Sequence, residues 1–336
     1  MKRIGVRLPN PVGDVVAATP LLRLLRQRNP DGRIVAFGNS KACEVLEGID
    51  SIDELEVLTP DCLSGWGASR RQAKRIKKLM LDSVYLLPNS FSSALAAARA
   101  RIPKRIGRRT ATRNFLLTEK LPPVGEPRAM TKIYTEMIGE PQEPRTELAI
   151  SIRGQRMASE TLEALAAHGI CPPFLGVAPG AAFGPSKIYP PELMAEAVRL
   201  SANATGLQPI YFGAPSESDL IRRIKQLCPA PFMYSSIDEM KALLKVCQVL
   251  LTMDNGARHI AAALDIPQVV LFGATDPRWT NFQQELTVSL QRDDVECSPC
   301  HKKVCPIDHR CLTRITPEVV AKAVTDAARK GTILSF

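Results

Sequence analysis

Short apolar runs alternate with helical segments along this chain, and the alternation predicts an α/β protein with two domains. Strands joined in this way form parallel sheets through right-handed crossovers. The length of 336 residues suits two domains of ordinary size. Apolar residues make up 45% of the sequence, as in other globular proteins. No apolar run reaches the roughly 18 residues that a membrane span requires.

The first domain is expected at residues 1–160. Its first strand follows Met1-Lys2-Arg3 directly, without the apolar core of a cleavable signal, which predicts a cytoplasmic protein. Leucines at helical spacing predict the first helix. The strands are expected at 4–8, 34–38, 83–87 and 147–152, and the helices at 19–27 and 90–100.

The second domain is expected at residues 170–320, with its sheet facing the first across a cleft. Pro191 begins one helix at its first turn, where proline is favoured. A final helix at 321–336 could pack back on the first domain. The strands are expected at 174–178, 209–213, 246–251 and 269–272, and the other helices at 191–202, 216–226, 238–245 and after 256.

The net charge of +10 is concentrated in the first half of the chain. Residues 64–113 contain 13 basic residues and one acidic residue. An ordinary solvated helix face explains residues 70–78 equally well, but the second basic cluster at 99–113 is loop-like. Together they favour an anionic partner such as a phosphorylated lipid, a membrane surface or a nucleic acid. Aromatic residues are absent from both clusters, which argues against stacking on single-stranded nucleic acid.

The turn Asp254-Asn255-Gly256 lies between an apolar strand and a helix. Backbone N–H groups and the helix dipole bind phosphate at such positions, which predicts a nucleotide site near His259. A second loop, 179–190, contains Gly180, Gly184 and Lys187, the composition of a phosphate cradle without P-loop spacing.

The loop after the first strand, residues 9–20, carries one carboxylate. Gly13 allows a tight backbone path, and Asp14 follows it. Asp14 could simply cap the first helix, which is the simpler interpretation, or act as a general base at the mouth of the sheet.

These three sites and their neighbours resemble the bacterial lipopolysaccharide heptosyltransferases, most closely the heptosyltransferase II type. The resemblance runs from residue 4 to about residue 325. It rests on VGDVV at 12–16, LLPNSF at 86–91, IPKRIG at 102–107, GAAFGPSKIYP at 180–190, FGAPSES at 212–218, DNGARHIAAAL at 254–264, LFGATDP at 271–277 and CSPCHKKVCPIDHRCL at 297–312.

The resemblance implies an inverting glycosyltransferase of the GT-B fold, with two Rossmann-like domains, that uses ADP-L-glycero-D-manno-heptose. Asp14 matches the catalytic base. Asn255 departs from the usual Ser or Thr of the family turn, although its amide can still donate a hydrogen bond at that position. The residues that match donor-binding positions are Gly180, Lys187, Asp254, Asn255, Gly256 and His259, with Glu217 or Asp219 at the ribose.

The implied acceptor is an anionic glycolipid of the Kdo-lipid A type, held at the cytoplasmic face of the inner membrane. Such an acceptor suits the basic first half of the chain. The sequence contains no DxD motif in its second half, so no catalytic metal or other cofactor is expected, and no nucleic acid partner. The residues expected to bind the acceptor are Gly13, Arg105, Arg108, Arg109 and Arg113.

Four of the nine cysteines cluster near the end of the chain, at Cys297, Cys300, Cys305 and Cys311. The first pair has the spacing of a zinc knuckle, but the last two are spaced more loosely than in most structural zinc sites. Reduced or loop-stapling cysteines are therefore favoured over zinc. The cluster is far in sequence from the three loops, which predicts a structural role.

Alternatives to heptose transfer remain at this point. One is a GT-B glycosyltransferase with another nucleotide sugar or acceptor. A nucleotide-sugar epimerase is less favoured, because it would not need a strongly basic half. A non-enzymatic module that binds anionic lipid is also less favoured, because the phosphate-binding loops would have no purpose.

Overall fold

The structure, a computed structural model, describes residues 1–139, 145–280 and 282–333. It divides into two compact units, unit 1 at Met1–Ala149 and unit 2 at Ile150–Phe336. Each unit contains one six-stranded sheet, and the described strand pairings are all parallel. The predicted fold class, two Rossmann-like α/β domains with parallel sheets, is confirmed.

The sheet of unit 1 has the strand order β3-β2-β1-β4-β5-β6. The order reverses direction at β1, between β2 and β4, and the loops that leave such a switch point diverge to form a binding crevice. The loop that carries Asp14 leaves β1 at this point. The strands are β1 (Arg3–Arg7), β2 (Arg33–Gly38), β3 (Glu54–Val57), β4 (Ser83–Leu86), β5 (Lys104–Arg108) and β6 (Glu119–Leu121).

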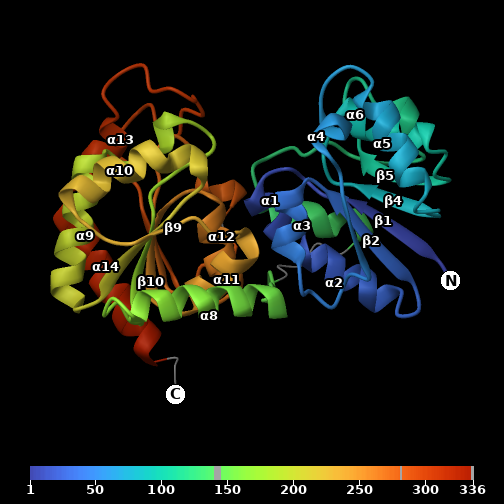
Figure 1. Cartoon of the computed structure of the whole chain (residues 1–336). Coiled ribbons are helices and arrows are strands. Elements are labelled where there is room, and N and C mark those ends of the chain that lie inside the picture. The colour runs from blue at the N-terminus through green and yellow to red at the C-terminus, as the bar shows by residue number, and fades with distance from the viewer. Residues whose placement is uncertain (140–144, 281, 334–336) are drawn as a thin grey trace. The chain divides into compact units, whose positions relative to one another are not determined.

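Helices cover both faces of this sheet. Figure 1 shows α4, α5 and α6 on one face and α1, α2 and α3 on the other. Small alanines of α6 bury against the strands and let α5 pack closely beside it. The helices are α1 (Val12–Ala17), α2 (Thr19–Arg28), α3 (Ser40–Leu46), α4 (Pro60–Leu63), α5 (Ala68–Lys77), α6 (Phe91–Arg99) and α7 (Met130–Thr135), with short 3-10 turns η1 (Asn114–Leu116) and η2 (Glu136–Ile138).

The sheet of unit 2 has the order β12-β11-β10-β7-β8-β9, with its switch point between β7 and β10. Thr252 of β10 lies opposite Ala178 of β7, so the two predicted phosphate loops leave adjacent strand ends. The strands are β7 (Phe174–Ala178), β8 (Gln208–Phe212), β9 (Phe232–Met233), β10 (Cys247–Met253), β11 (Gln268–Leu271) and β12 (Thr287–Leu290).

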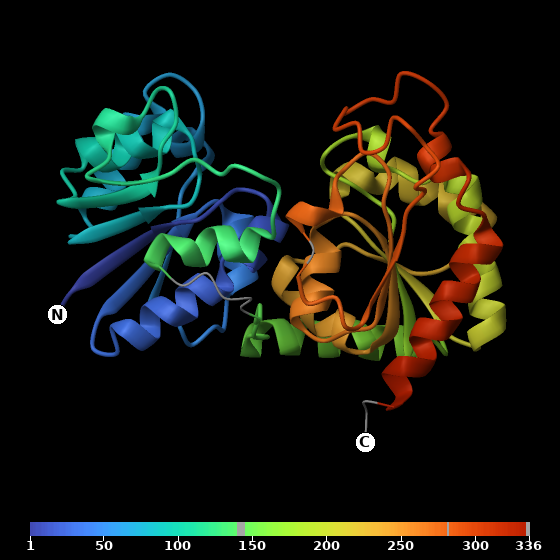
Figure 2. The ribbon, with the colours of Figure 1, turned by 180° about the vertical axis from the view of Figure 1, so that it is seen from behind.

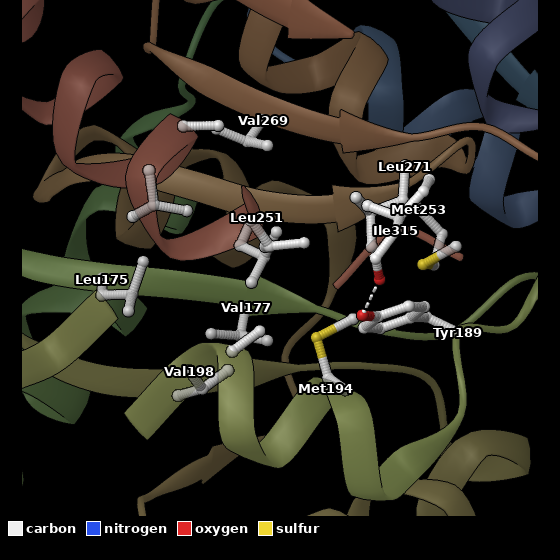
Figure 3. Packing of buried hydrophobic residues seen from close by; sticks show 14 of the residues in the cluster. Leu175, Val177, Tyr189, Met194, Val198, Leu251, Met253, Val269, Leu271 and Ile315 are labelled. Carbon is white, nitrogen blue, oxygen red and sulfur yellow. Dashed lines mark hydrogen bonds between the residues drawn. The ribbon is translucent and has the colours of Figure 1, made fainter. Parts of the chain in front are cut away.

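The core of unit 2 lies between the sheet and the helices α9, α10 and α14, and Figure 2 shows α14 running beside α9. Tyr189 is completely buried there, and its hydroxyl donates to the carbonyl oxygen of Ile315 at 2.5 Å (Figure 3). The helices are α8 (Ile152–Ala166), α9 (Pro191–Thr205), α10 (Ser218–Leu227), α11 (Ile237–Lys245), α12 (Gly256–Ala263), α13 (Arg310–Thr313) and α14 (Pro317–Ile333), with 3-10 turns η3 (Pro185–Lys187), η4 (Pro215–Glu217) and η5 (Pro277–Trp279).

Two expected elements differ from the structure. The strand expected at 147–152 does not form; Ser151 instead caps α8 by accepting a hydrogen bond from the Gly154 N–H. The division between the units therefore falls at residue 149 and α8 packs on α11 in unit 2.

The final helix was expected at 321–336 and as a partner of the first domain. It begins earlier, at Pro317, and its apolar residues lie in the core of unit 2. Residues 334–336 lie outside the described part of the chain. Across the described residues, no helix combines the length and the apolar character that crossing a membrane requires.

Candidate catalytic and anion-binding sites

Asp14 is the third residue of α1, just past the carboxyl end of β1. The helix begins at Val12 with Pro11 as its N-cap and has no side-chain cap, so Asp14 is not the capping residue. Gly13 has helical geometry within α1 and does not supply the tight path that the sequence suggested. Within the described residues, no hydrogen bond or ion pair engages the Asp14 carboxylate.

Burial raises the pKa of Asp14 from 3.8 to about 6. The side chain of Tyr134, on α7, is close enough for the two groups to interact. Burial raises the pKa of the Tyr134 hydroxyl well above its ordinary value, and the Asp14 charge raises it further. A carboxylate without a partner and with a pKa near 6 has the properties of a general base at neutral pH.

Asp254 is the centre of the site in unit 2, at the end of β10. Its carboxylate accepts hydrogen bonds from the Lys187 ammonium at 2.5 Å, from Arg258 Nε at 2.8 Å and from the Thr275 hydroxyl at 2.7 Å. The Lys187 ammonium also donates to the Asp254 carbonyl oxygen at 2.9 Å. Two of the three ammonium hydrogens are thus used, and the third can bind another acceptor.

The charges around Asp254 do not cancel. Burial would raise the pKa of Asp254, but the charges of Arg258 and Lys187 outweigh it and hold that pKa below its usual value. Burial and the Arg258 charge lower the pKa of His259 well below its ordinary value, so its imidazole is neutral. One anion and two cations therefore leave this buried cluster with a net positive charge, and such a cluster favours an anionic ligand.

Arg258, which belongs to this cluster, and His259 are the third and fourth residues of α12. The His259 ring stacks on Phe282 with centroids 5.4 Å apart, and its buried Nδ1 has no hydrogen-bond partner in the described structure. Arg258 is 1% exposed and lies over the ring of Phe272 at 5.1 Å. His259 thus offers an unused polar atom at the site, whereas Arg258 is held by the protein.

Asn255 positions the turn instead of offering a free amide. Its side-chain oxygen caps α12 by accepting from the N–H groups of Ala257 at 2.9 Å and Arg258 at 3.4 Å. Its side-chain nitrogen donates to the carbonyls of Ala178 and Gly180, at 3.0 and 2.8 Å. The expectation that this helix start presents free N–H groups is therefore wrong for Ala257 and Arg258, because Asn255 occupies them. Gly256 is the first residue of α12.

Gly180 and Glu217 meet at the ends of β7 and β8. A Cβ atom at Gly180 would lie 1.9 Å from Glu217 Oε1, so only glycine allows this approach. Glu217 also accepts from the Ala214 N–H at 2.8 Å. Asp219 is exposed and pairs with Arg222 at 2.7 Å. Of the two carboxylates that the sequence left open, only Glu217 lies beside the glycine loop.

The four arginines predicted to bind the acceptor differ in exposure. Arg113 is fully buried and donates to the Arg108 carbonyl and to Asn89 Oδ1 at 2.8 Å each. Arg108 is buried and pairs with Glu136 at 2.8 Å. Arg105 donates to the carbonyls of Leu116 and Ile102. These three guanidinium groups hold loops together, whereas Arg109 is exposed, and acceptor binding by the four arginines stays a prediction.

The cysteine-rich segment gathers its four thiols around one cavity of about 250 Å³, lined also by His309 and Ser186. All nine cysteines are free thiols. Burial raises the pKa of Cys311, and the nearby Cys305, Cys297 and Cys300 raise it further. Over the residues that the structure describes, no three His, Cys, Asp or Glu side chains are grouped closely enough to hold a metal ion.

The cysteine-rich segment lies against the phosphate loops, although its distance from them in the sequence suggested that it would be remote. The Ser186 N–H donates to the Lys303 carbonyl at 3.1 Å, and the His301 N–H donates to the Ala274 carbonyl at 2.7 Å. It therefore touches both the Lys187 loop and the turn that carries Thr275.

Sequence reasoning missed Arg258 and Thr275 at this site. Arg258 stands four residues after Asp254, the spacing at which oppositely charged side chains meet on a helix, and that signal was present. Thr275 lies 21 residues from Asp254 in the chain and carries no comparable local signal.

Comparison with known proteins agrees with this geometry. The model of glycosyltransferase family 9 (heptosyltransferase) matches residues 69–310. Lipopolysaccharide heptosyltransferase 2 of Salmonella typhimurium is 27% identical over 290 residues, covering 81% of this chain and 83% of that protein. The structure of E. coli ADP-heptose LPS heptosyltransferase II has a TM-score of 0.80 at 24% identity, covering 99% and 100% of the two chains. A family 9 glycosyltransferase from Veillonella parvula has a TM-score of 0.83 at 21% identity, covering 98% and 97%.

Two Rossmann-like units, one with a buried, net positive cluster at the switch point of its sheet, define a glycosyltransferase of the GT-B class. The family model covers well over half of the sequence, and the chain belongs to glycosyltransferase family 9, the heptosyltransferases. This membership makes the protein an enzyme and removes the epimerase and the non-enzymatic lipid-binding module from consideration.

Proposed function

We propose that this enzyme transfers a heptose, with inversion, from ADP-L-glycero-D-manno-heptose to the inner core of lipopolysaccharide. The observation that carries the proposal is the buried, net positive cluster of Lys187, Asp254 and Arg258 at the switch point of unit 2. Two relatives that match 81% of this chain are named lipopolysaccharide heptosyltransferase 2, which supports both the sugar and the acceptor.

The cluster is suited to a diphosphate leaving group. Transfer breaks the bond between the anomeric carbon and the diphosphate oxygen, and negative charge develops on that oxygen. The third ammonium hydrogen of Lys187 can donate to it, and the low-dielectric surroundings strengthen the interaction. A metal ion is not needed for this step, so the proposal includes no metal and no other cofactor.

The remaining contacts to the donor follow from position. Glu217 lies against Gly180 and can accept hydrogen bonds from the ribose hydroxyls, whereas Asp219 is already paired at the surface. The Nδ1 atom of His259 is buried and has no hydrogen-bond partner among the described residues, so a hydroxyl or phosphate of the donor can form a hydrogen bond with it. Asn255 and Gly256 shape the turn that holds Asp254.

Asp14 is the proposed base. The acceptor hydroxyl loses its proton to the carboxylate as its oxygen attacks the anomeric carbon from the side opposite the diphosphate. A pKa of about 6 keeps the carboxylate ionised at neutral pH and close enough to that pH to accept a proton efficiently.

The acceptor is proposed to be a Kdo- or heptose-bearing lipid A, and the enzyme is proposed to act at the cytoplasmic face of the inner membrane. Exposed basic residues of unit 1 support this. Arg109 is exposed after β5. The helix α5 turns Arg70, Lys74 and Lys77 to solvent while Ala73 and Ile76 are buried, and its C-cap residue Lys78 is exposed as well.

The test is transfer by purified enzyme to lipid A acceptors that carry Kdo with and without the first heptose, analysed by mass spectrometry. ADP-heptose should give a product one heptose heavier, and ADP-glucose, GDP-mannose and UDP-N-acetylglucosamine should give little. Turnover should be unchanged by EDTA, and NMR of the product should show the inverted anomeric configuration.

Transfer from UDP-N-acetylglucosamine in preference to ADP-heptose would refute the donor assignment. Loss of turnover in EDTA that Mg²⁺ restores would refute the metal-free mechanism. Sedimentation with anionic vesicles at low salt tests the membrane location separately, and an enzyme that stays in the supernatant would refute that part.

A further inference from the structure

The cysteine-rich segment is bonded to the loop that carries Lys187. The Ser186 hydroxyl donates to the Lys302 carbonyl at 2.5 Å, and the Ser186 N–H donates to the Lys303 carbonyl at 3.1 Å. Ser186 is 2% exposed and directly precedes Lys187 in η3. Two hydrogen bonds to one residue fix both its backbone and its side chain, so Ser186 cannot move without breaking them.

The approach of the two backbones is unusually close at this point. Gly184 has φ of +151°, and a Cβ atom there would lie 2.6 Å from the Lys303 carbonyl oxygen. Only glycine permits both this conformation and this contact. The Lys187 loop is therefore shaped to fit against residues 302–303, which is more than a chance surface contact.

The same segment holds the other side of the Asp254 carboxylate. The Ser298 hydroxyl donates to the Gly273 carbonyl at 2.8 Å, and the His301 N–H donates to the Ala274 carbonyl at 2.7 Å. Thr275, the next residue, donates to Asp254 Oδ2, the oxygen that also accepts from Lys187. Residues 298–303 thus connect the two loops that converge on one oxygen atom.

We propose that residues 298–303 form a clamp that sets the geometry of the donor-phosphate site, with Ser186 and Ser298 as its positioning residues. The clamp acts through Lys187 on one side and through Thr275 on the other. This inference rests on the proposed function, because it concerns the site assigned to the diphosphate. It also gives the cysteine-rich segment a role in catalysis that does not depend on a bound metal.

The physical basis is the steep dependence of charge-assisted hydrogen bonds on geometry. A displacement of about 1 Å in a catalytic group can reduce a rate by about two orders of magnitude. The Lys187 side chain is long, and its rotamers are restricted by the position of its backbone and by the Phe183 ring, 5.3 Å from its ammonium. Releasing Ser186 frees that backbone and lets the ammonium leave the position in which it meets the diphosphate.

The test is a double-mutant cycle. Ser186→Ala should raise the ADP dissociation constant and lower turnover, each by about tenfold, as expected for one buried hydrogen bond. In the Lys187→Ala background the same change should have almost no effect on ADP binding. Ser298→Ala should likewise weaken ADP binding in the otherwise wild-type enzyme and should have almost no effect on ADP binding in the Thr275→Val background. Ser186→Thr keeps the hydroxyl and should restore most of the affinity.

Ser201→Ala is the matched control. Ser201 is fully buried in α9, and its hydroxyl donates to the Ala197 carbonyl at 2.6 Å, so the variant loses the same type of bond away from the site. It should leave ADP affinity unchanged, because the lost bond lies within α9 and away from the site.

Two results would overturn the clamp. The first is a folded Ser186→Ala variant with the ADP affinity and turnover of the wild type. The second is a loss of ADP affinity on Ser186→Ala that is equally large in the wild-type and Lys187→Ala backgrounds. If the wild-type enzyme binds neither ADP nor pyrophosphate, the proposed function fails. The clamp is then decided by the same cycle on unfolding free energies, where strictly additive Ser186 and Lys187 effects would disprove it.

Discussion

Replacing Asp14 by asparagine separates the catalytic effect of a buried carboxylate from its effect on stability. Asparagine keeps the shape of the side chain but accepts no proton at any relevant pH. Turnover of Asp14→Asn should therefore fall by about 10²–10⁴-fold, the usual contribution of a general base. ADP affinity should be nearly unchanged, because the donor-binding residues belong to unit 2.

The stability effect has the opposite sign. Burial raises the pKa of Asp14 from 3.8 to about 6, so the fold favours the neutral carboxyl group. This contribution is fully present below about pH 4 and is lost as the pH rises through about 6. A pKa difference of this size corresponds to a change of about 3 kcal/mol at most in the free energy of unfolding. The partial exposure of the Asp14 side chain reduces this change to about 1–2 kcal/mol. Above pH 7, Asp14→Asn should be more stable than the wild type by that amount, and at pH 4 the two should be equal.

The assay is a pair of pH profiles. Wild-type kcat/KM should fall about tenfold between pH 7 and pH 5, because about one-tenth of a group with a pKa near 6 is ionised at pH 5. Unfolding free energies of the two proteins should be measured by urea denaturation over pH 4–8. Asp61→Asn is the matched control, since Asp61 is also in the first turn of a helix of unit 1 but has a lowered pKa, chiefly because Thr59 donates to it.

A wild-type profile that is flat between pH 5 and 7 would refute the assigned pKa. More than a tenth of wild-type turnover in Asp14→Asn would refute the role of base. The stability argument fails if Asp14→Asn is less stable than the wild type at pH 8, or if Asp61→Asn is stabilised in the same way.

Three further changes test the charged cluster around Asp254 and the basic surface of unit 1. Lys187→Ala should weaken ADP binding and slow turnover by about 10–100-fold each, and calorimetry showing unchanged affinity together with unchanged rates would remove Lys187 from the site. Asp254→Asn leaves Lys187 and Arg258 buried without a counter-ion and should lower the free energy of unfolding, measured by urea denaturation, by about 3–5 kcal/mol. The double variant Asp254→Asn/Arg258→Met should recover part of this loss. A loss below about 1 kcal/mol in Asp254→Asn would show that water reaches the cluster. Arg109→Glu should raise the acceptor KM severalfold at low salt without changing ADP affinity, and this effect should fade between about 0.05 and 0.5 M salt; equal KM values at low salt would show that Arg109 does not meet the acceptor.

Much of the fold could be predicted because its signals are local. The strands expected at 174–178 and 269–272 are short apolar runs followed by Pro or Gly, and both form, with the second beginning and ending one residue earlier than expected. The failure at 147–152 has a local cause as well. The sequence Glu-Leu-Ala-Ile-Ser-Ile has the alternation of a strand. The Ser151 hydroxyl oxygen, however, accepts a hydrogen bond from the Gly154 N–H and caps the start of a helix.

The site was predictable only where its residues carry their own signals. Lys187 and Asp254 stand in turns after strands, and the parallel topology brings those turns together. The choice between Glu217 and Asp219 could not be made from sequence, because it depends on a glycine 37 residues away from one of them meeting its side chain. The clamp at 298–303 was equally hidden, since its bonds run mostly through backbone carbonyls that carry no sequence signal.

Charge counts were the least reliable guide. Arg108 and Arg113 contribute to the basic cluster at 99–113, yet both are buried and bonded to the protein. An arginine buries its charge where carbonyl or carboxylate oxygens converge on it, and that convergence is created by tertiary structure. The sequence shows the charge but not whether solvent or a partner can reach it.

The packing of α14 has a consequence for how the chain is made. Every strand and helix of unit 1 precedes residue 150, so that unit can fold on the ribosome as soon as it has emerged. Unit 2 cannot, because Val320 and Val324 of α14 lie in its core and are synthesised after all six of the strands that the structure describes there. A nascent chain that has lost α14 would expose the apolar faces of β10 and α9. Chaperones should therefore bind unit 2 for longer than unit 1, and a stop codon before Pro317 should leave a folded first unit attached to an aggregating second one.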